Sequence, residues 1–197
     1  MKKFRKVVPE KIKASDLKPL DVTCGATKCD ENLHCFSRYV KQAQKKFGKK
    51  GVCHNCGEDS IDWNRMHKND IQDSQFMFTS LKKELIRNIF WNVKIDKLAV
   101  ENALKSNKTD LRTKAKKDLK ARIKKYNAYI DNQQTPLGKG NIVNYAQHAT
   151  ATCCRACLEA WHNIPKQQEL TDSQLEFCTD LVMKFIDERL PEIPEKQ

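Results

Sequence analysis

Apolar residues recur at intervals of three and four along most of the chain, which predicts a mainly helical protein. Helices are expected over about 32–47, 81–93, from Asp96 onward, 111–130, 154–162 and from Thr171 onward. The last of these opens with Thr171 and Gln174 in the spacing of a capping box. The longest stripe consists of Leu111, Ala115, Leu119, Ile123, Tyr126 and Ile130.

Two short runs lack this helical period and read as strands, Ile61–Met66 and Ile142–Tyr145. The expected fold class is therefore mainly α with a small β-hairpin. Residues 1–23 alternate basic and apolar positions around two prolines, which predicts an extended basic arm. Residues 24–197 are then expected to form a single domain, a size that suits one hydrophobic core.

Positive charge gathers in the middle of the chain. The formal net charge is +12, and the stretch from Lys82 to Lys125 holds 15 Lys and Arg against 5 Asp and Glu. Such an excess attracts polyanions, nucleic acid first, through release of counterions, although a solvated helical face has the same composition. The residues expected to contact the phosphates of DNA or RNA are Lys82, Lys83, Arg87, Arg112, Lys114, Lys117, Lys120, Arg122, Lys124 and Lys125.

The nine cysteines favour metal binding over disulfides. No run reaches the roughly 18 apolar residues of a membrane span, and the basic start has no apolar stretch behind it. An intracellular, cytoplasmic protein that contacts no membrane is therefore expected, in a compartment where thiols stay reduced. Nine is also an odd number, which complete disulfide pairing would not give.

Two Cys-x-x-Cys pairs are the strongest chemical signal. Cys53 with Cys56, and Cys154 with Cys157, have the spacing at which two thiolates face one ion, and zinc takes four such ligands. The sequence thus predicts one four-cysteine zinc site. Residues 58–152 would lie between its halves and include a basic helical insertion over about 80–131. In one alternative, Cys153 is the zinc ligand in place of Cys154. In the other, the two pairs are unrelated and consist of buried or redox-active thiols.

A looser set precedes the first pair. Cys24, Cys29 and Cys35 could hold a second zinc, with His34, His54 or His67 as the fourth ligand, or the three cysteines could serve an iron–sulfur cluster. Alternatively these cysteines pack as small apolar residues, as Cys178 is expected to do on the seam of the last helix.

The tight turn expected at Cys53–Gly57 is called the knuckle below. A knuckle followed at a distance by a Cys-x-x-Cys at the head of a helix resembles the treble-clef zinc module, an α+β core. With His67 shortly after the knuckle, the pattern is similar to HNH-type endonucleases that carry a four-cysteine zinc. The resemblance implies that His67 is the general base, and that Asp62 or Asp70 and His162 help to hold a Mg²⁺ ion. As an alternative, His67 is a surface or helix-capping histidine.

Three functions follow from these observations. The leading one is a zinc-stabilised nucleic-acid-binding protein that contacts phosphate through a lysine-rich helical surface. The others are a metal-dependent HNH-like nuclease, and an interaction module in which zinc is a scaffold and the basic helices meet an acidic protein.

Overall fold

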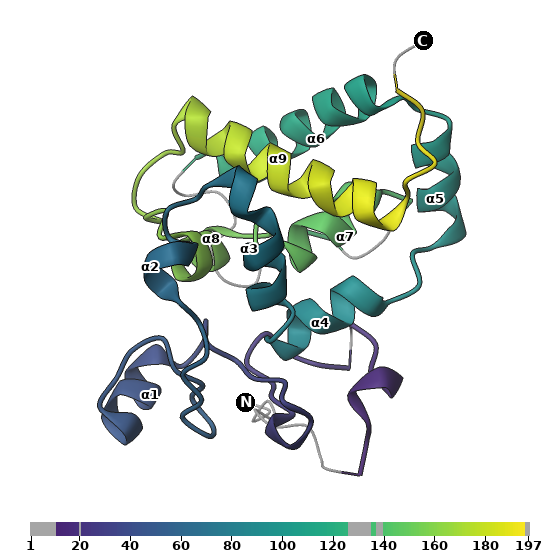
Figure 1. Ribbon diagram of the computed structural model, residues 1–197. Coiled ribbons are helices and arrows are strands. Elements are labelled where there is room, and N and C mark those ends of the chain that lie inside the picture. Colours follow the sequence, from purple (N-terminus) through teal and green to yellow (C-terminus); the bar gives the residue numbers. More distant parts are fainter. Residues whose placement is uncertain (1–10, 20, 126–134, 137–139, 196–197) are drawn as a thin grey trace. The chain divides into compact units, whose positions relative to one another are not determined.

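The chain folds into two compact units. A computed structural model describes residues 11–19, 21–125, 135–136 and 140–195. The N-terminal unit comprises 1–68 and 75–93, and the C-terminal unit comprises 69–74 and 94–197. The chain leaves the N-terminal unit after residue 68, returns to it at residue 75 and leaves it again after residue 93 (Figure 1).

Short elements joined by long irregular segments make up the N-terminal unit. In chain order they are η1 (Ala14–Asp16), η2 (Cys29–Glu31), α1 (Val40–Phe47), α2 (Trp63–Met66), α3 (Ser74–Leu81) and α4 (Leu85–Asn92). One core cluster consists of Ala26, Leu85 and Ile89, with four partly buried apolar residues against it. Many further apolar side chains of this unit are buried, among them Phe36, Met77, Phe78, Leu81 and Trp91.

The helix predicted over 32–47 begins only at Val40. Asn32 and Tyr39 both have left-handed backbone angles, with φ of 58° and 56°, which interrupt a right-handed helix. Between them, the backbone N–H of His34 donates to the carbonyl of Lys83 at 2.8 Å, so this stretch bonds to another segment instead of to itself. The helix ends at Gly48, whose φ of 74° lies in the left-handed region.

Both predicted strands are wrong, because each segment is helical. Asp62 caps α2 by accepting from the N–H of Arg65, and Asn141 caps α7 (Ile142–Ala149) by accepting from the N–H of Val143. Within the described ranges there is no β-sheet, only the isolated bridges Lys28–Leu33 and His34–Glu84. The small hairpin is therefore not seen, and the treble-clef resemblance is not confirmed.

The C-terminal unit is a helical assembly. It contains η3 (Ile71–Asp73), α5 (Lys97–Leu104), α6 (Lys108–Ile123), α7, α8 (Arg155–His162) and α9 (Asp172–Arg189). Helix α9 packs along α6 and also against α7 (Figure 1). No helix among the described residues has the length and apolar character needed to cross a bilayer.

The predicted helical stripes form the core of this unit. On α6 the buried residues are Leu111, Ala115, Leu119 and Ile123, as expected; Tyr126 and Ile130 lie outside the described residues. The capping box of α9 is confirmed, with Thr171 and Gln174 each bonding the other's backbone. Cys178 is fully buried on α9, which confirms its prediction as a core residue.

A buried guanidinium joins three segments of the C-terminal unit. Arg155, only 2% exposed, donates to the carbonyls of Ile123 at 3.0 Å, Pro165 at 2.5 Å and Gln168 at 2.6 Å. Burial lowers the pKa of Arg155. This side chain therefore satisfies carbonyls at the end of α6 and in the loop after α8, which lie far apart in the sequence.

Replacing Arg155 with Met should lower the free energy of unfolding by about 3 kcal/mol, because buried carbonyls lose donors that carry charge. Urea denaturation followed by circular dichroism measures the loss. Arg112→Met is the control: the ion pairs of Arg112 are 41% exposed on its side, so each is worth about 1 kcal/mol or less. Equal losses in both variants would contradict the role of Arg155.

Candidate metal centre

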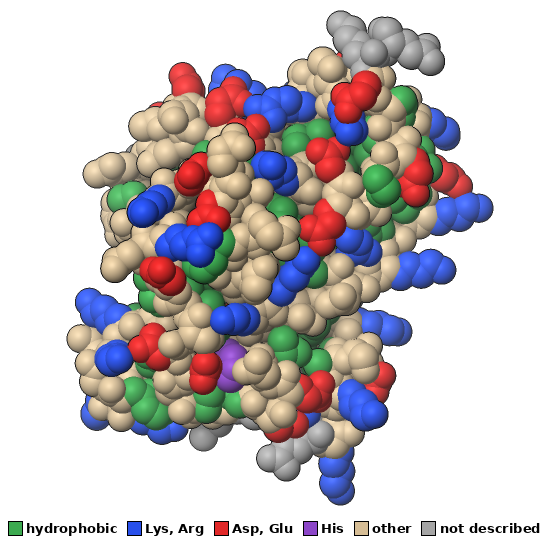
Figure 2. Space-filling model, in the orientation of Figure 1, with side chains coloured by type: hydrophobic (Ala, Val, Ile, Leu, Met, Phe, Trp, Pro, Cys, Tyr) green, Lys and Arg blue, Asp and Glu red, His purple; other side chains and the backbone are tan. Residues whose placement is uncertain are grey.

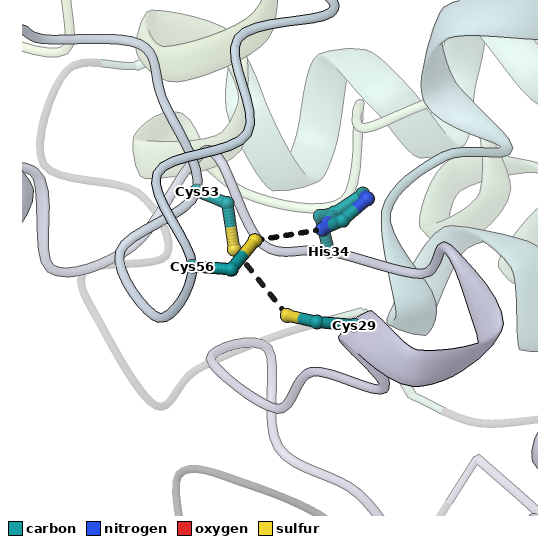
Figure 3. A group of neighbouring side chains, drawn as sticks. All are labelled: Cys29, His34, Cys53 and Cys56. Carbon is teal, nitrogen blue, oxygen red and sulfur yellow. Dashed lines mark hydrogen bonds between the residues drawn. The ribbon is translucent and has the colours of Figure 1, made fainter.

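Four potential metal ligands converge in the N-terminal unit. They are Cys29 from η2, His34 from the following segment, and Cys53 and Cys56 from the knuckle. Their ligand atoms all lie within 4.8 Å of one another. Figure 3 shows the three sulfurs and the imidazole pointing toward a common centre. Three thiolates and one imidazole are a standard structural zinc set.

The spacing of these atoms fits a zinc tetrahedron. Bond lengths of about 2.3 Å to sulfur and 2.0–2.1 Å to nitrogen put two sulfurs about 3.8 Å apart, and a sulfur and a nitrogen about 3.5 Å apart. The Sγ atoms of Cys29 and Cys53 are 3.9 Å apart, and Cys56 Sγ lies 3.4 Å from His34 Nδ1. The pairs therefore need little movement to accept the ion.

The knuckle is a tight turn that turns both of its thiols to one side. The N–H of Gly57 donates to the carbonyl of Cys53 at 2.9 Å, and the N–H of Cys53 donates to the backbone carbonyl of Glu58 at 2.8 Å. Gly57 has φ of 85°, and a Cβ there would meet the Phe47 ring at 2.9 Å. Glycine is thus required both by backbone angle and by the close approach of α1.

A second turn positions Cys29 and His34. Lys28 and Leu33 exchange backbone hydrogen bonds of 2.7 and 2.9 Å across a loop that Asn32 completes in the left-handed region. The side-chain oxygen of Asn32 lies 3.0 Å from His34 Nε2. With a metal ion bound, a hydrogen bond donated by Nε2–H to the Asn32 oxygen would leave the lone pair of Nδ1 directed at the ion, which is the arrangement a metal-binding imidazole needs.

The segment that carries His34 is anchored to the start of α4. The N–H of Leu85 donates to the carbonyl of His34 at 2.9 Å. The buried carboxylate of Glu84 accepts from the N–H groups of Phe36 and Ser37 at 3.2 and 3.1 Å, and from the Ser37 hydroxyl at 2.7 Å. Arg87, equally buried, balances this charge at 3.2 Å. The ligand loop is therefore fixed by a buried ion pair.

The two knuckle thiols differ in acidity. Burial raises the pKa of Cys53, but hydrogen bonds from His34 and from nearby backbone N–H groups outweigh it and lower the pKa to about 6. Partial desolvation of Cys56, with the neighbouring sulfurs of Cys29 and Cys53, raises its pKa to about 12. Near neutral pH one thiol is thus ionised, and a cation would displace the proton of the other.

The remaining members of the looser cysteine set are not among the four converging ligands. Cys35 is buried, and its thiol donates to the carbonyl of Cys24 at 3.2 Å. Burial raises the pKa of Cys35 well above its ordinary value. Of the predicted second set, the structure thus brings Cys29 and His34 to the knuckle and leaves Cys24 and Cys35 out.

The second Cys-x-x-Cys pair also has different neighbours from those predicted. Cys154 and Cys157 belong to the C-terminal unit, where they group with Cys153. The knuckle finds its two further ligands within its own unit, and a tetrahedral ion held by those four residues has no position left for another thiol. The turn at Asn32, which pairs Cys29 with His34, was the signal in the sequence that indicated this arrangement.

Residues suggested by the nuclease resemblance have local structural roles. Asp62 and Asp70 cap short helices by accepting from the N–H groups of Arg65 at 3.0 Å and Gln72 at 2.9 Å. The ring of His67 lies 5.3 Å from that of Trp63. His162 is fully buried, and its Nε2 bonds the carbonyl of Thr150 at 2.9 Å. An HNH assignment is not confirmed.

Many of the predicted phosphate contacts are occupied within the protein. Arg87 is buried, so it is not available to a ligand. Lys82 lies 4.1 Å above the Trp91 ring, and Lys83 donates to the carbonyl of Ser60 at 3.0 Å. Four others bond acidic or amide side chains, namely Arg112, Lys114, Arg122 and Lys124. Those left exposed and unpaired with described acidic residues are Lys117, Lys120 and Lys125.

These features define a mainly helical protein with a Cys₃His group that could hold zinc. The chain belongs to the family described as Domain of unknown function (DUF4186), whose model matches residues 75–187, more than half of the sequence. The four converging ligands all precede the matched region. No solved structure matches the chain.

Cys53→Ser should remove one equivalent of zinc from the purified protein, measured by elemental analysis, since no other thiol completes the set. Amide hydrogen exchange should rise across the ligand loops and stay unchanged in α6 and α9. In the wild type, zinc affinity should fall as pH is lowered, most steeply below about 6, where Cys53 also gains a proton. Unchanged zinc content in Cys53→Ser would contradict the centre.

Glu84→Ala should cost about 3–5 kcal/mol of unfolding free energy, because it leaves Arg87 as an unpaired buried charge and frees the loop after His34. Asp59→Ala is the matched control: it breaks the exposed pair with Lys49 and should cost about 1 kcal/mol or less. Chemical denaturation of zinc-loaded protein measures both. A loss as small as that of the control would show that Glu84 does not anchor the loop.

Proposed function

We propose that this protein is a zinc-stabilised nucleic-acid-binding protein, and that α1 carries its main phosphate-binding surface. The supporting observation is the run from Arg38 to Lys50, in which six residues are Lys or Arg and none is acidic. Lys41, Lys45, Lys46, Lys49 and Lys50 are all exposed. In Figure 2, blue side chains line the outer edge of the region that α1 occupies.

Charge is divided unequally between the two units. The N-terminal unit holds 19 Lys and Arg against 9 Asp and Glu, whereas the C-terminal unit holds 18 against 16. The basic helix α6 faces acidic α9, and their ion pairs include Arg112 with Asp180 at 2.5 Å and Arg112 with Glu176 at 2.9 Å. Figure 2 shows blue and red side chains intermingled over the face where α9 lies. The unbalanced positive charge is thus in the unit with the metal ligands.

Two contacts connect α1 to the knuckle that carries Cys53 and Cys56. Lys46 donates to the carbonyl of Asn55, inside the knuckle, at 2.7 Å. Phe47 at the end of α1 lies against Gly57, the residue that follows Cys56. A cation that orders the knuckle would therefore also fix the helix that presents the lysines.

A second basic surface supports the same function. Along α6, a hollow of about 500 Å³ is lined by Arg112, Thr113, Lys116, Lys117, Lys120 and Glu176. Arg112 and Lys116 are paired there with Glu176 and Asp180, so Lys117 and Lys120 are the cations that a phosphate group would meet. This surface retains part of the phosphate-binding role predicted for the lysines of α6. Contacts to phosphate carry no base information, so we expect weak sequence preference.

The test removes three charges from each surface in turn. Lys41, Lys45 and Lys50 are changed to Gln on and just after α1, and Lys117, Lys120 and Lys125 to Gln on and just after α6 as the matched set. Affinity for a fluorescent DNA or RNA duplex is measured against salt. The wild type should weaken steeply with salt, and the α1 variant should lower the slope of log K by up to about 2–3, since each lost phosphate contact removes about 0.7–0.9.

The outcomes are distinct. A larger effect on α1 than on the matched set supports the proposal, and the reverse places the main surface on α6. A wild-type affinity that does not respond to salt would exclude phosphate binding. If an acidic protein competes for the same lysines while nucleic acid fails to bind, the chain is an interaction module instead.

A further inference from the structure

Three buried thiols meet in the C-terminal unit and form a group that shares no residue with the Cys₃His group. Cys153, Cys154 and Cys157 are 0–1% exposed, and their sulfurs all lie within 4.8 Å of one another. The Sγ atoms of Cys153 and Cys157 are 3.6 Å apart. That is close to the separation of about 3.8 Å that two sulfurs have around one zinc, and far from the bond of about 2.05 Å in a disulfide.

Local structure explains why the three sulfurs converge. Cys154 is the N-cap of α8 and Cys157 lies in its first turn, so the two are neighbours on one side of the helix. Ala151, with φ of 57°, reverses the chain just before them and brings Cys153 to the same side. Hydrogen bonds among the three thiols and their burial raise the pKa of Cys153, and that of Cys154 to about 12, against the preference of a helix N-terminus for thiolates, so these thiols keep their protons until a cation binds.

The charged and imidazole side chains near these thiols in the sequence bond backbone carbonyls. Arg155, between Cys154 and Cys157, directs its guanidinium to three backbone carbonyls. His148 and His162 each bond a backbone carbonyl through Nε2, at 2.7 Å to Thr135 and 2.9 Å to Thr150. The described ligand set is therefore all sulfur, which selects soft, thiophilic cations.

Cys178 provides a comparison within the same unit. It is fully buried like the other three, yet it is not part of any described group of potential metal ligands. A cysteine that only fills space in a core has no need of two more within a sulfur–sulfur contact. Three clustered thiols at a helix start are the arrangement of a binding site.

We propose that Cys153, Cys154 and Cys157 form a second metal site, which binds a thiophilic cation, Zn²⁺ or Cu⁺, through three thiolates. Binding releases the thiol protons to solvent, with no change in the oxidation state of the sulfurs. The site lies within the region matched by the family model, unlike the first centre. It does not depend on nucleic-acid binding by α1.

Cadmium titration of a chain without the first centre tests the proposal. In the triple variant Cys29→Ser, Cys53→Ser and Cys56→Ser, Cd²⁺ added under reducing conditions should still produce a sulfur-to-cadmium charge-transfer band. The band should saturate at one equivalent with about half the wild-type intensity, because three of six thiolates remain. Adding Cys154→Ser should weaken the band and the affinity by at least about tenfold, whereas adding Cys178→Ser should leave both unchanged.

Two further measurements make the test decisive. Circular dichroism, which reports the helix content of the whole protein, confirms that each variant is folded, and Cys153→Ser replaces Cys154→Ser if the latter is not. Competition with a zinc chelator and with a Cu⁺ chelator identifies the preferred cation. A folded triple variant that gives no cadmium band, or one whose band is equally sensitive to Cys178→Ser, overturns the site.

Discussion

A metal ion held by Cys29, His34, Cys53 and Cys56 would be the strongest single cross-link in the N-terminal unit. The unit has an apolar core that includes Leu85 and Ile89, but each buried aliphatic side chain contributes only about 1.5–3 kcal/mol. Zinc in a structural site contributes about 10–16 kcal/mol. The ligands come from two turns separated by α1, so a bound ion closes the loop that contains this helix. The same constraint links the stability of the unit to the presentation of its lysines.

The two basic helices show why the charge of a segment is not the charge of a surface. Helix α6 has many lysines, but α9 brings carboxylates such as Glu176 and Asp180 against it. The run from Arg38 to Lys50 contains fewer basic residues, yet Lys49 with Asp59 is the only ion pair that its lysines form with described acidic residues. The number of basic residues in the sequence favours α6 as the phosphate-binding surface. The number that have no ion pair with described acidic residues favours α1.

Long regular stripes predicted most of the C-terminal unit, because α6 and α9 bury one face over several turns and have side-chain caps. The short elements were harder. In α2 and α7, a single capping side chain, Asp62 or Asn141, decides in favour of helix over a run of residues that also suits a strand. The segment after Asn32 is set by hydrogen bonds to Lys83 and Leu85, contacts that no local pattern contains.

For the cysteines, too, the sequence predicts local geometry better than tertiary contacts. Cys-x-x-Cys spacing correctly indicates which thiols lie side by side, since that geometry is local. It does not indicate which pair meets which further ligand, because this depends on tertiary contacts over tens of residues. The turn that joins Cys29 to His34 is visible in the sequence only as an asparagine between them. The contribution of Cys153 depends on the backbone reversal at Ala151.

The interleaved path of the chain has a practical consequence for dissecting the protein. The family match begins at residue 75, but α4, which follows at Leu85, belongs to the unit built mainly from earlier residues. A fragment limited to the matched residues would lack Ala26 and the apolar residues around it. Leu85 and Ile89 would then be exposed to water on one face of α4. Truncation at the edge of the homology would therefore produce an insoluble polypeptide more readily than an autonomous module.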